Sequence, residues 1–153
     1  MPDPQVIQQF NEEKIAQRMS QKAKERFVHA NTPDALLEED VNIIYEFCKI
    51  AIGLVKNDLA GHVDEKHAKN LVILFIKCLT QAIIKCDQHK IAGDIKVRAL
   101  QGLALDLYNL CKEYTLNVFQ NNLEEAAQEE GRQQIRKATM QRLKFHIEEA
   151  KKV

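Results

Sequence analysis

The chain has 153 residues, and its 22 Lys and Arg side chains balance 22 Asp and Glu side chains, so the formal net charge at pH 7 is zero. Apolar residues make up 45 % of the sequence, which is enough for one hydrophobic core, whereas only 5 residues are Gly and 3 are Pro. This composition disfavours turn-rich β folds, collagen and disordered linkers, and the balanced charge gives no general attraction to nucleic acid or to anionic membranes.

Gly, Pro and helix-capping residues divide the chain into five segments with apolar residues at helical spacing. In the second segment, Thr32, Pro33 and Asp34 predict a helix that begins at residue 33, because Thr can cap the first turn, Pro has no N–H to leave unpaired and Asp opposes the positive helix end. Gly61 and Gly93, each followed by Asp within three residues, indicate two later boundaries. The predicted helices span residues 4–29, 33–58, 64–90, 94–120 and 122–151.

The three middle segments each carry two neighbouring apolar stripes, which predicts burial on two sides, and 64–90 is expected to be the most buried. The first and last segments have one narrow stripe each, so we expect them to form an outer layer. Gly53 and Gly102 lie inside helical patterns, where a missing side chain allows two helices to approach closely. Because short turns between helices of about 25 residues favour antiparallel neighbours, the predicted fold is all-α, a single-domain antiparallel bundle of about five long helices over residues 1–153.

All four cysteines fall on apolar stripes, and none forms a Cys-x-x-Cys pair. A desolvated thiol keeps its proton and packs as a small apolar group, so we expect free, buried thiols rather than disulfides, redox pairs or zinc ligands. Cys86, flanked by Lys85 and Asp87, is the cysteine with the most polar surroundings. The four are Cys48, Cys78, Cys86 and Cys111.

The turn near residue 62 holds the densest group of possible metal ligands. His62 and His67 are five residues apart, about 140° on a helix, so they converge on an ion only if His62 lies outside a helix that Asp64 caps. A metal or small-ligand site at His62, Asp64 and His67 is the alternative functional hypothesis, and it includes an enzyme that uses this site. Capping by Asp64 and compensation of the helix dipole by Glu65 explain the same residues without a metal.

Other signatures of enzymes and cofactors are absent from the sequence. It has no glycine-rich phosphate loop, no Gly-x-Ser-x-Gly and no haem attachment motif. His67 and His89 stand about 33 Å apart along one helix, too far to ligate one iron together. We therefore expect no cofactor. The polar first residues and the lack of a long apolar run also predict a cytoplasmic protein without a membrane span.

The first segment has a basic ridge, defined as Lys14, Arg18, Lys22 and Arg26, which recur every four residues beside an apolar stripe. One interpretation is structural: either a solvated helix flank whose long side chains pack their stems over the core edge, or an internal pairing with acidic residues of the next helix. The other is a docking surface for an acidic protein, an anionic lipid surface or RNA phosphates. The acidic residues available for internal pairing are Glu38, Glu39 and Glu46.

The last segment repeats this arrangement, with Arg132 and Arg136 after an acidic start, an order that also suits the helix dipole. The main functional hypothesis is thus a non-enzymatic interaction or adaptor module that binds a protein partner, expected to be acidic, through its terminal helices. Homo-oligomerisation through the same helices is a further alternative. Nucleic acid is disfavoured because few aromatic residues are free to stack on bases. The predicted partner-binding residues are Lys14, Arg18, Lys22, Arg26, Arg132 and Arg136.

Overall fold

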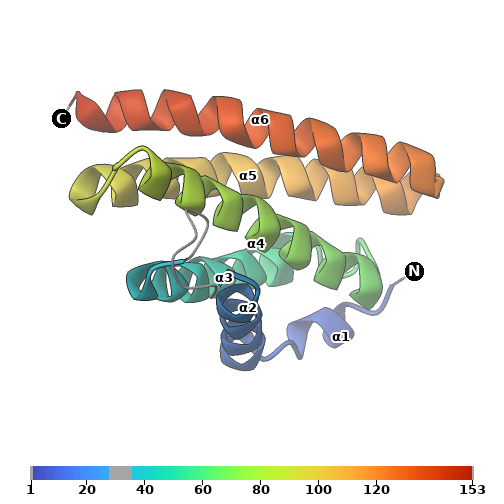
Figure 1. The fold of residues 1–153 in the computed structure, drawn as a ribbon. Coiled ribbons are helices and arrows are strands. Elements are labelled where there is room, and N and C mark those ends of the chain that lie inside the picture. Colours follow the sequence, from blue (N-terminus) through green and yellow to red (C-terminus); the bar gives the residue numbers. More distant parts are fainter. Residues whose placement is uncertain (1, 28–35, 153) are drawn as a thin grey trace.

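The computed structural model describes residues 2–27 and 36–152, which form an all-α helical bundle (Figure 1). These residues contain six helices and no strand, which confirms the predicted fold class and corrects the predicted count of five. Within the same ranges, no helix is both long enough and apolar enough to cross a membrane. The helices are α1 (Pro4–Gln8), α2 (Glu12–Phe27), α3 (Glu38–Asp58), α4 (Glu65–Gln88), α5 (Gly93–Asn121) and α6 (Glu125–Lys151).

The predicted first helix, 4–29, is wrong as a single element, because the chain breaks between α1 and α2. Asn11 causes the break: its side-chain oxygen accepts the N–H of Lys14 at 3.0 Å, so it starts a new helix instead of continuing the old one. The break turns Ile7 and Phe10 into the core, where both are buried. Neither Gly nor Pro stands at this position to signal it.

The predicted start at residue 33 is also wrong, because Leu36 and Leu37 are not helical and α3 begins at Glu38. Asp40 sets this start: its Oδ2 accepts the backbone N–H of Leu37 at 3.2 Å and so satisfies a donor at the helix end. The Thr32, Pro33 and Asp34 cap lies outside the described residues.

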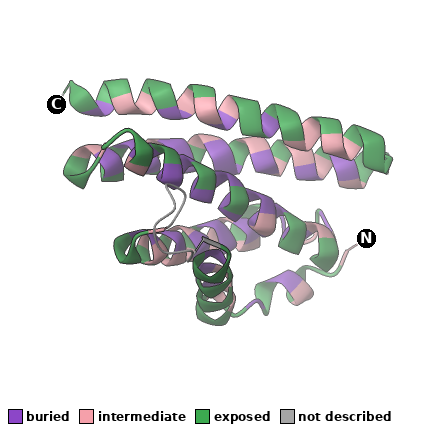
Figure 2. Ribbon diagram, viewed as in Figure 1, coloured by how far each residue is buried: buried purple, intermediate pink, exposed green. Residues whose placement is uncertain are grey.

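α4 lies at the centre of the bundle and has the largest set of buried residues of the six helices, as predicted. α5 and α6 lie side by side along the top of Figure 1, α4 crosses in front of them, and α3 and α2 lie below. Figure 2 shows the difference in burial, with buried positions frequent along α4 and exposed positions dominating α2. α2 and α6 are therefore outer helices, and both pack against α4.

The four cysteines are free and buried, as the sequence predicts. Desolvation raises the pKa of Cys48 to about 12 and that of Cys86 to about 11, and it raises the pKa of Cys78 and Cys111 as well. These thiols are protonated at neutral pH and pack as apolar groups.

Two glycines allow α5 and α6 to pack closely. A Cβ at Gly131 of α6 would stand 2.7 Å from the ring of Tyr114 on α5, and a Cβ at Gly102 of α5 would overlap the imidazole of His146 on α6. The hydroxyl of Tyr114 donates to the carbonyl of Gln128 at 3.0 Å, which holds the ring over Gly131. The predicted role of Gly102 is thus confirmed, whereas Gly53 has no atom within 4 Å of such a Cβ.

Gly131→Ala is expected to destabilise the bundle, and Gly53→Ala to stabilise it. At residue 131, overpacking against the tethered Tyr114 ring costs about 1–3 kcal/mol, against a gain of about 1 kcal/mol in helix propensity. At residue 53, inside α3, the gain stands alone. Urea unfolding followed by circular dichroism measures both free energies. Equal stabilisation of the two variants would show that the α5–α6 contact has room for a methyl group.

Candidate functional site

A groove of about 720 Å³ opens on the surface between α2, α4 and α6. Its size is that of a typical ligand site rather than of a packing defect. The three helices around it are two outer helices and the central one, so residues far apart in the sequence meet there. We call it the basic groove; it is lined by Met19, Lys22, Ala23, Arg26, Ile73, Ile76, Lys77, Cys78, Thr80, Gln81, Arg136, Thr139 and Met140.

Positive charge gathers around the basic groove although the whole chain is neutral. Lys22 and Arg26 come from α2, Lys77 from α4 and Arg136 from α6, and no Asp or Glu is among the lining residues in the part of the chain that the structure describes. All four basic residues are exposed. The groove therefore unites predicted residues from both terminal helices, and it adds Lys77, which the sequence analysis missed.

The floor of the groove is apolar. Met19, Ile76 and Met140 supply large side chains, one from each helix. The hydroxyls of Thr80 and Thr139 each donate to the carbonyl four residues earlier, both at 2.7 Å, so their protons are used inside their own helices. A ligand in this groove would meet an apolar floor below cationic side chains.

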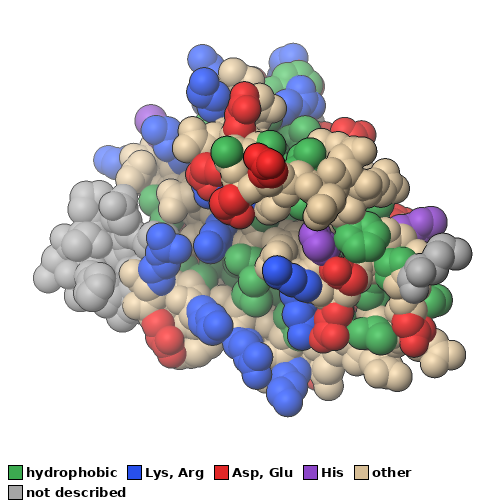
Figure 3. All heavy atoms as spheres, turned by 90° about the vertical axis from the view of Figure 1, so that its right-hand side faces the viewer, with side chains coloured by type: hydrophobic (Ala, Val, Ile, Leu, Met, Phe, Trp, Pro, Cys, Tyr) green, Lys and Arg blue, Asp and Glu red, His purple; other side chains and the backbone are tan. Residues whose placement is uncertain are grey.

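The basic ridge continues along α2 beyond the groove. In Figure 3, a row of Lys and Arg side chains runs along the lower part of the molecule, where α2 lies in Figure 1. Arg18 and Lys14 are exposed on this helix, about one and two turns before Lys22, and are not among the residues that line the groove. Lys22 and Arg26 of the basic ridge thus line the groove, and Lys14 and Arg18 lie beside it.

Among the described residues, three members of the basic ridge show no internal pairing with α3, while Arg26 takes part in a further interaction. Lys14, Arg18 and Lys22 form no ion pair with acidic side chains of α3. In the two ion pairs that join α2 and α3, the acidic residues lie on α2 and the basic ones on α3: Glu12 and Glu13 contact lysines of α3 at 3.3 and 3.8 Å.

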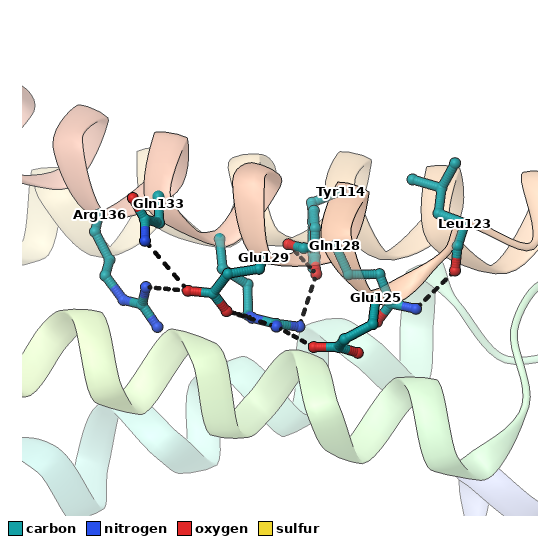
Figure 4. A network of polar contacts seen from close by, with 8 residues as sticks. Tyr114, Leu123, Glu125, Gln128, Glu129, Gln133 and Arg136 are labelled. Carbon is teal, nitrogen blue, oxygen red and sulfur yellow. Dashed lines mark hydrogen bonds and ion pairs between the residues drawn. The ribbon is translucent and has the colours of Figure 1, made fainter.

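Arg132 and Arg136 of α6 have different surroundings; Figure 4 labels Arg136 and its contact with Glu129. Arg132 Nη2 lies 2.5 Å from Glu125 and 2.6 Å from Glu129, and these hydrogen bonds raise the pKa of its guanidinium. It is not among the residues that line the groove. Arg136 has one long contact with Glu129, at 3.5 Å, and its side chain is 49 % exposed. Arg136 is therefore available to a ligand, whereas Arg132 is held by two carboxylates of its own helix and by the hydroxyl of Tyr114 on α5.

The turn before α4 shows a helix cap at the predicted metal residues. Asp64 is the N-cap, and its Oδ1 accepts the backbone N–H of His67 at 2.8 Å and lies 2.6 Å from His67 Nδ1. Burial opposes ionisation of Asp64, but these hydrogen bonds outweigh it and lower its pKa. His62 lies before the cap, as the metal hypothesis requires, but the described residues contain no group of three or more His, Cys, Asp or Glu arranged to hold a metal ion.

A second hollow, of about 540 Å³, adjoins the basic groove farther along α4 and α6. Met140 lines both hollows. The walls of this second hollow again combine apolar and basic side chains. Among the described residues that line it, Glu148 is the one acidic side chain, and it pairs with Lys151 at 3.5 Å. We call this hollow the C-terminal cleft; it is lined by Lys85, His89, Ile91, Met140, Leu143, Lys144, Ile147, Glu148 and Lys151.

A buried ion cluster, defined as Asp40, Asp87 and Lys96, joins α3, α4 and α5. Lys96 Nζ donates to Asp40 Oδ1 at 2.5 Å and to Asp87 Oδ1 at 2.6 Å, and it lies 3.5 Å from the exposed carboxylate of Glu39. Asp87 Oδ2 is buried without a hydrogen-bond partner among the described residues. No local sequence pattern signals this cluster, and its burial makes it a structural rather than a docking feature.

Two members of the buried ion cluster, Asp40 and Lys96, have pKa values well above their ordinary ones. Burial and the neighbouring Asp87 carboxyl raise the pKa of Asp40 to about 7, although Lys96 opposes that shift. Burial disfavours the charged form of Lys96, but its hydrogen bonds to the two carboxylates outweigh this and raise its pKa. Lys96 is thus charged at neutral pH, and Asp40 exchanges a proton near neutrality.

A further polar contact fixes α6, the helix that forms one wall of both hollows. Asp106 Oδ2 on α5 accepts from Arg142 Nε at 2.8 Å and lies 2.6 Å from His146 Nε2. Burial works against ionisation of Asp106, but hydrogen bonds from His146 and Arg142 prevail and lower its pKa. The ionised carboxylate therefore holds two side chains of α6 in place.

Fold and site together define an all-α helical bundle with a basic, apolar-floored groove on its surface. No family model, curated protein or solved structure matches this chain. A function has to be inferred from the side chains that the bundle brings together.

Proposed function

We propose that this protein is an interaction module that binds an acidic, partly apolar segment of a protein partner in the basic groove. The observation that carries the proposal is the composition of the described groove lining: four exposed Lys and Arg residues surround an apolar floor, and none of these described lining residues is acidic. The two outer helices supply three of these four cations. A partner with Asp or Glu beside Leu-like side chains matches both properties.

The shape and content of the groove favour a protein over RNA or a membrane. Among the described residues, none that lines the groove is aromatic, so these residues offer no platform on which bases could stack. A hollow of about 720 Å³ accommodates a few inserted side chains, whereas binding to a lipid surface needs an apolar face that projects into the bilayer. A protein segment can fill the hollow and pair with its rim at the same time.

Reversing three groove charges tests the proposal. The variant Lys22→Glu, Lys77→Glu and Arg136→Glu leaves Arg26 unchanged, because Arg26 takes part in a further interaction. The probe is a fluorescent acidic amphipathic peptide with Leu on one face and Glu beside it, and anisotropy measures its affinity. We expect affinity to fall by about 3 kcal/mol, or roughly a hundredfold, because three attractions become repulsions. Stability should change by about 0.5 kcal/mol or less, since the side chains are exposed.

The matched control reverses Lys24, Lys66 and Lys137, which are exposed on the same three helices but do not line the groove. It changes the net charge by the same amount, so a similar loss of affinity in both variants would mean general attraction and would overturn the proposal. Absence of peptide binding to the wild type, or binding to phosphatidylserine vesicles that the groove variant alone loses, would also overturn it.

A further inference from the structure

The basic groove and the C-terminal cleft lie end to end. Both are walled by α4 and α6, and Met140 lines both. Along α4 the lining runs from Ile73 to His89, and along α6 it runs from Arg136 to Lys151 in the same direction. The two helices are parallel along this surface, with the antiparallel α5 between them in the chain.

The length of the combined surface matches a helix. At 1.5 Å per residue, the lined stretch of either wall is about 22–24 Å long, or roughly four helical turns. Large apolar side chains continue from the basic groove into the cleft, where Leu143 and Ile147 follow Met140 at helical spacing on α6. A third helix lying between two parallel helices would bury one apolar face along its whole length.

Basic side chains continue along the rims of both hollows as well. Lys77 and Lys85 stand on α4, and Arg136 and Lys144 on α6, so each wall carries a cation beside each hollow. All four are exposed. A helix between them needs acidic residues on both flanks of its apolar stripe and near both ends.

We infer that the ligand is an amphipathic α-helix of about 16 residues from another protein, acidic on both flanks, which lies along α4 and α6 across both hollows. This inference rests on the proposed function and extends it from a short segment to a continuous helix. A second copy of the chain fits poorly. Its acidic stretch at the start of α6 has no exposed large apolar side chain among the described residues, and its basic ridge would place like charges together.

The test compares two labelled peptides of about 9 and 18 residues with the same Leu stripe and Glu flanks. A third peptide of the longer length carries Pro in its middle, which breaks a helix without changing charge. We expect the long peptide to bind at least about tenfold more tightly than the short one, and the Pro peptide to lose that gain. In the variant Lys85→Glu and Lys144→Glu, the long peptide should bind no more tightly than the short one.

The control variant reverses Lys66 and Lys137, which lie outside both hollows, and should keep the gain in full. Suppose that the variant Lys85→Glu and Lys144→Glu still binds the long peptide more tightly than the short one, while the triple charge reversal in the basic groove abolishes binding. The extended helix is then wrong and the proposed function stands. Equal affinity of the Pro peptide would likewise exclude a helical ligand. If reversal in the basic groove has no effect, both proposals fail. Dimerisation that the long peptide inhibits would assign the surface to a second copy and overturn the inference.

Discussion

Lys96→Met is expected to lower the free energy of unfolding by about 3–5 kcal/mol, the cost of removing one partner from a buried ion pair. The methionine fills nearly the same space but leaves Asp40, which is fully buried, and Asp87 without the ammonium group that both contact. Two carboxylates would then face each other in a desolvated site. Urea unfolding at pH 7, followed by circular dichroism, measures the loss.

Two further variants separate the buried ion cluster from ion pairing in general. Lys112→Met removes a contact of 3.8 Å with Asp58 between partly exposed side chains, and such pairs contribute only about 0–1 kcal/mol. The double variant Lys96→Met with Asp40→Asn removes one of the stranded charges and should recover part of the stability. A loss at Lys96 no larger than at Lys112 would show that the cluster is open to water.

Apolar periodicity predicted most of the fold because helices that bury a face repeat their apolar residues every three or four positions. It located α4 as the most buried helix and placed its cap at Asp64, where the structure confirms it. It missed the break at Asn11 because a polar residue between two helical stretches also fits an exposed helix position. It placed the start of α3 too early, because Asp40 exerts its capping effect through one hydrogen bond to Leu37.

The sequence predicted the basic groove only in part. The four-residue spacing of the basic ridge identified Lys22, since neighbours on one helix face can be counted along the chain. Lys77 was missed, although it is the single charged residue between Leu71 and Ile84, because the apolar pattern around it predicted burial. A lone charge in such a run is a signal that could have identified the groove.

The buried ion cluster was beyond prediction from local patterns. Asp40 and Lys96 are 56 residues apart, and Asp87 lies on a third helix. Each residue alone looks like an ordinary surface charge near a helix end. Only the packing of three helix ends removes water from all of them, and nothing in the spacing of one helix encodes that approach.

Stability is expected to fall as pH rises from about 4 to about 7, through the contribution of Asp40. Its pKa is 3.8 in an ordinary setting and about 7 in the fold, because of burial and the neighbouring Asp87 carboxyl. Within this window the folded state holds a proton that the unfolded chain has lost, so the unfolding free energy decreases as protons become scarce. The contribution is fully present below the unfolded pKa and is lost above about pH 7; it amounts to roughly 2–4 kcal/mol.

Asp40→Asn isolates this effect, because the amide occupies the same place and does not titrate. The difference in unfolding free energy between wild type and variant, measured by urea titration at half-unit steps from pH 4 to pH 8, should change steadily in favour of the variant. Asp106→Asn provides the contrast: the pKa of Asp106 is lowered from 3.8, so its contribution stays nearly constant from pH 4 to pH 8 and is lost only when the pH falls below that range. A flat difference curve for Asp40 would mean that its carboxylate stays ionised beside Lys96 throughout, and that Lys96 alone neutralises the cluster.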